Sequence, residues 1–198
     1  MSDHNKTKED TIFHFSAIHS LLSVLFDTSD FWIAGGAIRD YIQSNKELKD
    51  YDIFVNNKHS FSTISKSLEK AGYKEQIARE NSVIYEKDGE SDIDLVRVDT
   101  CGGLVIDGFD LTCCSAQFGP DGFKHHPEFF ADNDDKIIKI NKLTLPYYTY
   151  KRIAKHIRKG YVVSDMVLAE VMEFAVHEME KEEAPKSNDP KSEGSSGL

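Results

Sequence analysis

The chain has 198 residues, of which 39% are hydrophobic and 29% charged, a composition that suits one folded domain with a polar extension. No stretch approaches the roughly 20 apolar residues of a membrane span, and the first ten residues lack the apolar core of a signal peptide, so we expect a cytoplasmic protein. The formal net charge of −10 disfavours a broad nucleic-acid surface, and the three cysteines form no Cys-x-x-Cys metal motif.

The first part of the chain predicts helices packed beside a sheet. Apolar residues recur at helical intervals over residues 11–26, which indicates an amphipathic helix. Residues 31–34 form an apolar run typical of a buried strand, two glycines then permit a sharp turn, and residues 37–43 favour a helix. A second strand is expected at 50–55, followed by a helix at 60–71 that ends where Gly72 follows.

Strand patterns dominate the next part. Alternating polarity predicts strands at 73–78, 82–87 and 92–98, and a longer strand at 109–118 that ends at a Pro-Asp-Gly turn. A short strand at 136–141 precedes a basic helix at 147–159, and a final helix runs from Ser164 through Met179.

We therefore predict an α+β fold, a mixed and mostly antiparallel sheet flanked by helices. One domain is expected over residues 11–162, with a C-terminal helix at 163–180. Residues 1–10 and 181–198 are expected to be disordered, the latter because its Lys, Glu, Ser, Asn, Pro and Gly content offers no apolar face.

The glycine turn leads into an acidic strand. Free amides at the start of the helix after Gly35 and Gly36 favour a phosphate. Asp50 and Asp52 lie two residues apart, so in a strand they share one face, where their repulsion favours a cation such as Mg²⁺ between them. The alternative is a solvated turn before Ile53.

A later strand repeats the acidic pattern. Asp92 and Asp94 also share one strand face, and Asp94 stands between the apolar Ile93 and Leu95. Either acid is a candidate third metal ligand. The alternative is an exposed edge strand that acidic residues keep soluble.

At these motifs the chain resembles the polymerase-β-type nucleotidyltransferases, in particular the head domain of class II tRNA CCA-adding enzymes and bacterial poly(A) polymerases. Four blocks in the family's order carry the resemblance: residues 35–40, 50–53, 109–114 and 150–161. It implies the family's head fold with one or two C-terminal helices, an NTP substrate, and Mg²⁺ or Mn²⁺ as cofactor. It also implies that Asp50, Asp52 and Asp94 are the catalytic, metal-binding carboxylates, with Asp92 in reserve.

The resemblance further implies a nucleotide site formed by Gly35, Gly36, Arg39, Asp40, Asp110, Thr112, Arg152 and Lys155. Arg39 is placed to meet triphosphate oxygens and Asp40 to brace the turn, or else the two form a surface ion pair. The block around Asp110 departs from the family pattern, because Gly108 and Phe109 stand where arginines are usual. Lys151, Arg152 and Lys155 compensate from the basic helix, with Arg152 and Lys155 on one side of it, or else they form a solvated face.

The resemblance does not extend to the substrate-selecting region. We find no Glu-Asp-x-x-Arg motif, with which the family selects C and A, so CCA addition is not expected. We expect a stand-alone transferase of phage or bacterial type that moves an NMP from an NTP to a hydroxyl on an RNA 3′ end, a small molecule or a protein. The alternative is a catalytically reduced nucleotide- or protein-binding module of the same fold. His125 and His126 lack companion ligands and are expected on a surface strand.

Overall fold

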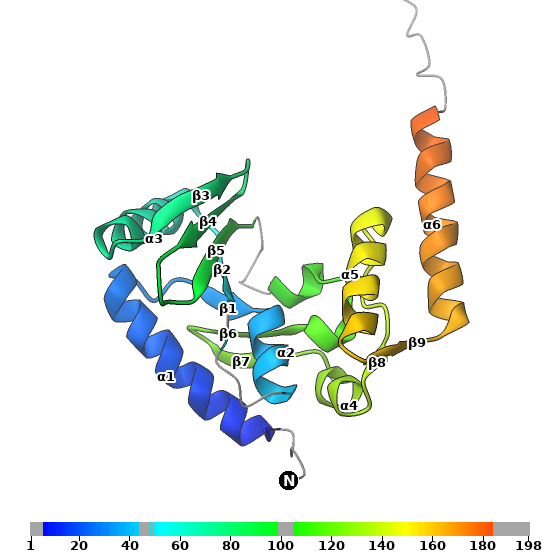
Figure 1. Cartoon of the computed structure of the whole chain (residues 1–198), viewed down its shortest axis with the longest axis horizontal. Helices are drawn as coiled ribbons and strands as arrows, with labels where there is room; N and C mark the ends of the chain where they lie inside the picture. Colours follow the sequence, from blue (N-terminus) through cyan, green and yellow to red (C-terminus); the bar gives the residue numbers. More distant parts are fainter. Residues whose placement is uncertain (1–5, 44–47, 49, 99–104, 184–198) are drawn as a thin grey trace, which may run out of the picture.

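A computed structural model of the chain describes residues 6–43, 48, 50–98 and 105–183. Its helices and strands, shown in Figure 1, are α1 (Lys8–Phe26), β1 (Trp32–Ala34), α2 (Gly36–Gln43), β2 (Asp50–Val55), α3 (Lys58–Lys70), β3 (Lys74–Ala78), β4 (Ser82–Glu86), β5 (Asp92–Arg97), the 3₁₀ turns η2 (Val105–Gly108) and η3 (Thr112–Cys114), β6 (Ala116–Gly119), β7 (Gly122–His125), α4 (Phe129–Asp134), β8 (Ile137–Ile138), α5 (Pro146–Arg158), β9 (Val162–Val163) and α6 (Asp165–Glu183).

Seven of the strands form one mixed sheet in the order β3-β4-β5-β2-β1-β6-β7. The pair β2 and β5 is parallel, whereas the other neighbours are antiparallel. The predicted α+β class with a mostly antiparallel sheet is therefore confirmed. Strands β8 and β9 form a separate parallel pair beside α5.

The main core lies between the sheet and the helices α1, α2 and α3. Helix α1 packs against α3 and β6, and α2 packs against β1 and β2. Ile33, Ile53 and Leu95 are fully buried in this core, together with Phe15 and Phe31 from α1 and the segment before β1. Because neighbouring strand residues point to opposite faces, the residues next to Ile53 and Leu95 lie on the other side of the sheet.

A second core joins η3 to the C-terminal elements. Leu111, Cys113, Ile138, Ile153 and Tyr161 are its buried members, and Val171 adds α6. Figure 1 shows α5 and α6 side by side at the end of the molecule away from α1 and α3. In the part of the chain described, no helix has the length and apolar character needed to cross a membrane.

The predicted strand at 109–118 is wrong. Residues 112–114 form the turn η3, and the strand begins only at Ala116. The alternating apolar residues that suggested a long strand serve two different cores, since Cys113 lies in the second core and Ala116 in the main one. A turn between them allows the chain to reach both.

The ends of the predicted ordered region also differ. Helix α1 begins at Lys8, inside the span expected to be disordered, because Thr7 and Asp10 form a capping box. Helix α6 continues through 181–183, which consists of good helix formers, and not only to residue 180. Residues 1–5 and 184–198 lie outside the described residues.

Helix α4, which the sequence reading missed, is a short segment of six residues.

Candidate active site

The left-handed backbone of the turn between β1 and α2 favours glycine at position 35. Gly35 has a φ of +74°, and a Cβ built there would lie 3.4 Å from Asp52 Oδ2 and 3.5 Å from the Phe109 ring. The Gly36 amide donates a hydrogen bond to the Asp52 carboxylate. The glycines therefore bring the start of α2 against the acidic strand, and the phosphate site expected at this helix start stays a prediction.

The parallel pairing of β2 and β5 brings the two acidic strands into register. Asp52 is the direct partner of Asp94, and Asp50 is the partner of Asp92. Asp52 and Asp94 are half-buried on the sheet face opposite the main core. Two carboxylates from segments about forty residues apart thus face each other beside the glycine turn.

These carboxylates are electrostatically coupled. Burial, followed by the charges of Asp50 and Asp94, raises the pKa of Asp52 to about 7, although Lys155 and the Gly36 amide act to lower it. Burial and the charge of Asp50 also raise the pKa of Asp94, against the opposing effect of Arg79. Without a bound metal ion, the site therefore disfavours the ionised forms of Asp52 and Asp94.

A divalent cation fits the chemistry of this cluster. Among the described residues, Asp94 Oδ1 is buried and has no hydrogen-bond partner, and carboxylate oxygens are ligands that Mg²⁺ and Mn²⁺ prefer. A cation would supply the missing partner and favour the ionised carboxylates. Of the residues that the structure describes, however, only Cys113, Cys114 and His156 bring three ligand atoms within 4.8 Å of one another. The acidic groups are therefore spaced more widely than that.

Basic side chains of α5, and Lys159 directly after it, differ in their partners. Lys155 is exposed and lies close enough to Asp52 to lower its pKa. Arg152 Nη1 donates to Asp110 Oδ2 at 2.6 Å, and Lys159 Nζ lies 2.8 Å from Asp40 Oδ2. Lys155 is thus the α5 cation that the structure relates directly to the acidic cluster.

Arg39 and Asp40 form an ion pair at the first turn of α2. The Arg39 side chain is only 4% exposed, and its Nη2 lies 2.7 Å from Asp40 Oδ1. Its Nη1 reaches inward, 3.1 Å from Cys114 Sγ and 2.7 Å from His156 Nε2. Although burial alone would raise the pKa of Asp40, the neighbouring cations hold it below its usual value. Arg39 is therefore a buried group that joins α2 to η3 and α5, rather than a surface ion pair.

Asp110 and Thr112 are both buried in networks that hold η3 in place. Asp110 accepts hydrogen bonds from Thr149 and Arg152 of α5. Thr112 donates to Asp132 of α4. The structure thus places these two predicted nucleotide contacts in hydrogen bonds with α5 and α4.

Two residues at the site were missed by the sequence reading. Arg79, in the turn between β3 and β4, lies 4.0 Å from Asp94 Oδ2. The sequence indicated only that Phe109 stands where the resembled family usually has an arginine. In the structure, the Phe109 ring lies against the Gly35 turn and packs edge-on against Phe54. No local sequence signal marks Arg79, because its position depends on how β4 pairs with β5.

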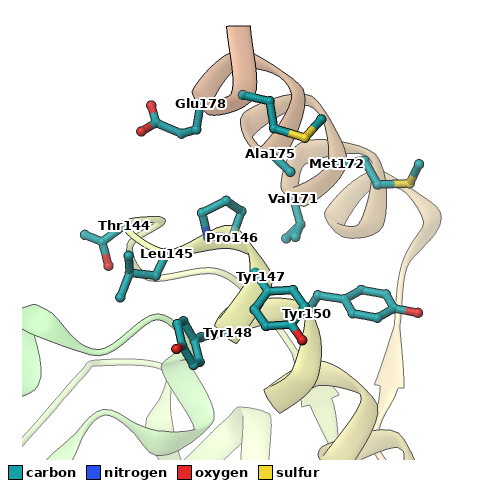
Figure 2. Close-up of a pocket in the computed structure, with 11 residues that line it drawn as sticks. Thr144, Leu145, Pro146, Tyr147, Tyr148, Tyr150, Val171, Met172, Ala175 and Glu178 are labelled. Carbon is teal, nitrogen blue, oxygen red and sulfur yellow. The ribbon is translucent and has the colours of Figure 1, made fainter. Parts of the chain in front are cut away.

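An apolar pocket elsewhere shares no residue with this site. It has a volume of about 450 Å³ and lies between the start of α5 and one side of α6 (Figure 2). Tyr147, Tyr148 and Tyr150 line it from α5, and Val171 and Met172 line it from α6. The acidic cluster, not this pocket, carries the groups expected for phosphate chemistry.

The pKa of Asp52 gives a first prediction. A carboxyl group with a pKa of about 7 when folded and near 4 when unfolded is protonated in the folded state up to neutral pH. Its contribution to stability is therefore lost as the pH rises from about 4 to 7. We expect the metal-free melting temperature to fall over this range, and Mg²⁺ to raise it more at pH 8 than at pH 6. The decisive quantity is the difference in melting temperature between wild type and Asp52→Asn at each pH. If the melting temperatures of the two proteins changed equally with pH, the assignment to Asp52 would be contradicted.

The fold matches solved structures of tRNA-processing enzymes over most of this chain. A Thermotoga maritima CCA-adding enzyme complexed with tRNA gives a TM-score of 0.63 at 15% identity, covering 87% of this chain and 46% of that one. A CCA-adding enzyme in complex with ATP gives 0.60 at 16%, covering 85% and 44%. A tRNA nucleotidyltransferase with a primer tRNA and an incoming ATP analog gives 0.53 at 18%, covering 78% and 49%.

These likenesses confirm the predicted fold, the nucleotidyltransferase head of CCA-adding enzymes, and the chain spans about half the length of the proteins it matches. No curated protein matches it. A family model described as Gabija anti-defense 2 family protein matches residues 5–136, which include the glycine turn and both acidic strands. Since the match covers about two thirds of the sequence, the chain belongs to the Gabija anti-defense 2 (Gad2) family.

Proposed function

We propose that the chain is a metal-dependent nucleotidyltransferase that moves a nucleoside monophosphate from an NTP to a hydroxyl acceptor. The observation that carries this proposal is the pairing of Asp52 with Asp94 across two parallel strands, beside the Gly36 amide at the start of α2. A repelling carboxylate pair beside the start of a helix suits a cation and a triphosphate together.

Each group has a role in this reaction. Asp50, Asp52 and Asp94 would hold Mg²⁺ or Mn²⁺, which neutralises phosphate charge and favours deprotonation of the attacking hydroxyl. Asp94 is preferred to Asp92 because its unpartnered oxygen is buried and its pKa responds to Asp50. The acceptor oxygen attacks the α-phosphorus, and the bond to pyrophosphate breaks. The amides at the start of α2 and Lys155 would orient the phosphates.

The family adds a biological role. We propose that the transfer acts against the Gabija defence, which the family is named for opposing. The acceptor is then a hydroxyl of a protein, an RNA 3′ end or a small molecule on which that defence depends. The relatives bound to tRNA or ATP support NTP as the donor, since they share the fold.

The test is a transfer assay with the purified chain, each labelled NTP, Mg²⁺ or Mn²⁺, and an extract of cells that carry Gabija. We expect label transfer and pyrophosphate release with one or more NTPs, and loss of both with Asp50→Asn combined with Asp52→Asn. An extract from cells without Gabija is the matched control for the acceptor. Transfer that persists in the double variant would exclude this site.

A second candidate function is a nucleotide- or protein-binding module that has lost catalysis. It is favoured by the pairing of Arg39, Arg152 and Lys159 with carboxylates. It is also favoured by Gly108 and Phe109, which stand where the nucleotidyltransferases that the chain resembles usually have arginines. This function predicts that an NTP raises the melting temperature without any pyrophosphate release. Turnover under the same conditions would exclude it.

A further inference from the structure

A sulfur atom lies in the buried network that joins α2 to α5. Cys114 Sγ, at the end of η3, is 3.1 Å from Arg39 Nη1 and 3.3 Å from His156 Nε2. Cys113 is fully buried next to it and donates to it, whereas Cys114 is partly exposed. Three segments that are distant in sequence therefore meet at one thiol.

The hydrogen bonds around Cys114 define its protonation. His156 Nδ1 lies 2.7 Å from the Arg152 carbonyl oxygen and must donate to it, so Nε2 of a neutral ring is an acceptor. Arg39 Nη1 lies 2.7 Å from that Nε2 and fills it with one of its two protons. The other Nη1 proton points to Cys114 Sγ, which also receives the Cys113 thiol proton. Cys114 Sγ thus accepts from Arg39 and Cys113, and Arg39 already occupies the neighbouring acceptor, His156 Nε2, so the arrangement suits a thiolate.

The charges agree with this hydrogen-bond pattern. The hydrogen bond from Cys113 and the positive charge of Arg39 outweigh the opposing effect of burial, so that the pKa of Cys114 lies well below its usual value. The pKa of Cys113 is raised by the same contact and by burial. One of the two adjacent cysteines therefore carries the negative charge and the other keeps its proton.

A metal ion is a poor alternative for this cluster, although its three ligand atoms lie within 4.8 Å of one another. The Arg39 guanidinium already donates to both Cys114 Sγ and His156 Nε2. Arg39 is buried and ion-paired with Asp40, so it supplies a fixed positive charge where a metal ion would have to lie. The cluster is complete as a thiolate and guanidinium pair.

We propose that Cys114 is a modification site, a thiolate held by Arg39 that reacts with small electrophiles and with hydrogen peroxide. In the reaction with peroxide, the Cys114 sulfur attacks one oxygen, an S–O bond forms and the O–O bond breaks. Hydroxide leaves and takes a proton from solvent to become water. The sulfur is oxidised to a sulfenic acid and the peroxide is reduced.

Modification also changes the contacts of Arg39. A group attached to Cys114 would need space that the guanidinium now occupies at 3.1 Å. Arg39 Nη2 lies 3.5 Å from the position of a Cβ on Gly36, so its displacement would be felt at the glycine turn. Any effect on transfer rests on the proposed function, whereas the reactivity of Cys114 does not.

The experiment uses the full chain with Cys101→Ser, which leaves Cys113 and Cys114 as its two thiols. Iodoacetamide labelling is followed by mass spectrometry at pH 6 and pH 8, with N-acetylcysteine as the reference. An ordinary thiol with a pKa near 8.5 reacts about 70-fold faster at pH 8 than at pH 6, whereas we expect less than about a threefold change at Cys114. The titratable or charged groups that act on this sulfur are Arg39, Cys113, His156 and Tyr161, and Asp40 is paired with Arg39.

Two further arms test the cause. Arg39→Gln should restore a steep pH dependence of the labelling rate at Cys114. Circular dichroism checks that this variant folds. If it does not fold, the pH profile of the protein with Arg39 decides the question alone. Hydrogen peroxide followed by dimedone should label Cys114 and leave Cys113 free. An ordinary pH profile at Cys114, equal labelling of Cys113, or no dimedone adduct at Cys114 would each overturn the proposal.

Discussion

Replacing Asp52 or Asp94 by asparagine is expected to lower nucleotidyl transfer about a thousandfold, on the order of 4 kcal/mol in the activation free energy. The amide keeps the shape of the side chain but loses the negative charge that would hold a divalent cation. Asp92→Asn is the matched control, since Asp92 occupies the same strand face and pairs with Asp50 in register. That control should change transfer by no more than a few-fold. Rates of pyrophosphate release measure all three variants.

The same Asp52 variant is expected to stabilise the metal-free protein. The pKa of Asp52 is about 7, so at pH 8 its ionised form opposes folding. Because the side chain is partly exposed, we expect a gain of about 1 to 2 kcal/mol for Asp52→Asn. Lower activity together with higher metal-free stability would show that Asp52 acts in the site and does not support the fold. A loss of both would show that Asp52 supports the fold instead.

Gly119→Ala is expected to cost about 2 to 3 kcal/mol of unfolding free energy and to lower the melting temperature by roughly 5 to 10 °C. A Cβ at Gly119 would lie 2.1 Å from Cδ1 and 2.5 Å from Nε1 of the Trp32 ring. Trp32 is only 5% exposed and packs beside Ala34 and Val105, so the ring has little room to move away. It is also the single tryptophan of the chain, so its fluorescence reports the disturbance directly.

Two controls make the Gly119 prediction specific. Gly108 is exposed, and a Cβ there would meet nothing within 4 Å, so Gly108→Ala should stay within about 0.5 kcal/mol of wild type. Adding Gly119→Ala to Trp32→Leu should cost less than adding it to wild type, because the clashing ring is gone. Equal costs in both backgrounds would show that the contact with Trp32 is not the cause.

Elements with a strong local pattern could be predicted from the sequence. The strand at Asp50–Val55 was predicted with its observed bounds, and the helices at 37–43 and 147–159 differ from α2 and α5 by about one residue. Hydrophobic period and glycine position act within a few residues, so a short window of sequence contains the signal. The strand predicted at 109–118 was wrong because its apolar residues are divided between two cores, and that division is not contained in a short window of sequence.

The candidate site shows the same division. The acidic pairs and the glycine turn were visible as motifs, whereas the register that pairs Asp52 with Asp94 came from the structure, and the choice of Asp94 as the third carboxylate stays a prediction. Arg79 and the inward direction of Arg39 were not visible, because each depends on contacts between distant segments. Cys114 and His156 are 42 residues apart in the chain and meet only when α5 packs against η3.

The sequence by itself therefore determined the class of fold, the glycine turn and the carboxylates available for metal chemistry. These depend on residue type and on spacing within a strand or a helical turn. The tertiary structure alone decided which carboxylates face each other, which cations remain near them and which thiol meets Arg39. Those outcomes follow from strand register and helix packing, which bring together residues that no local pattern relates, and burial then alters the pKa values of Asp52 and Cys114.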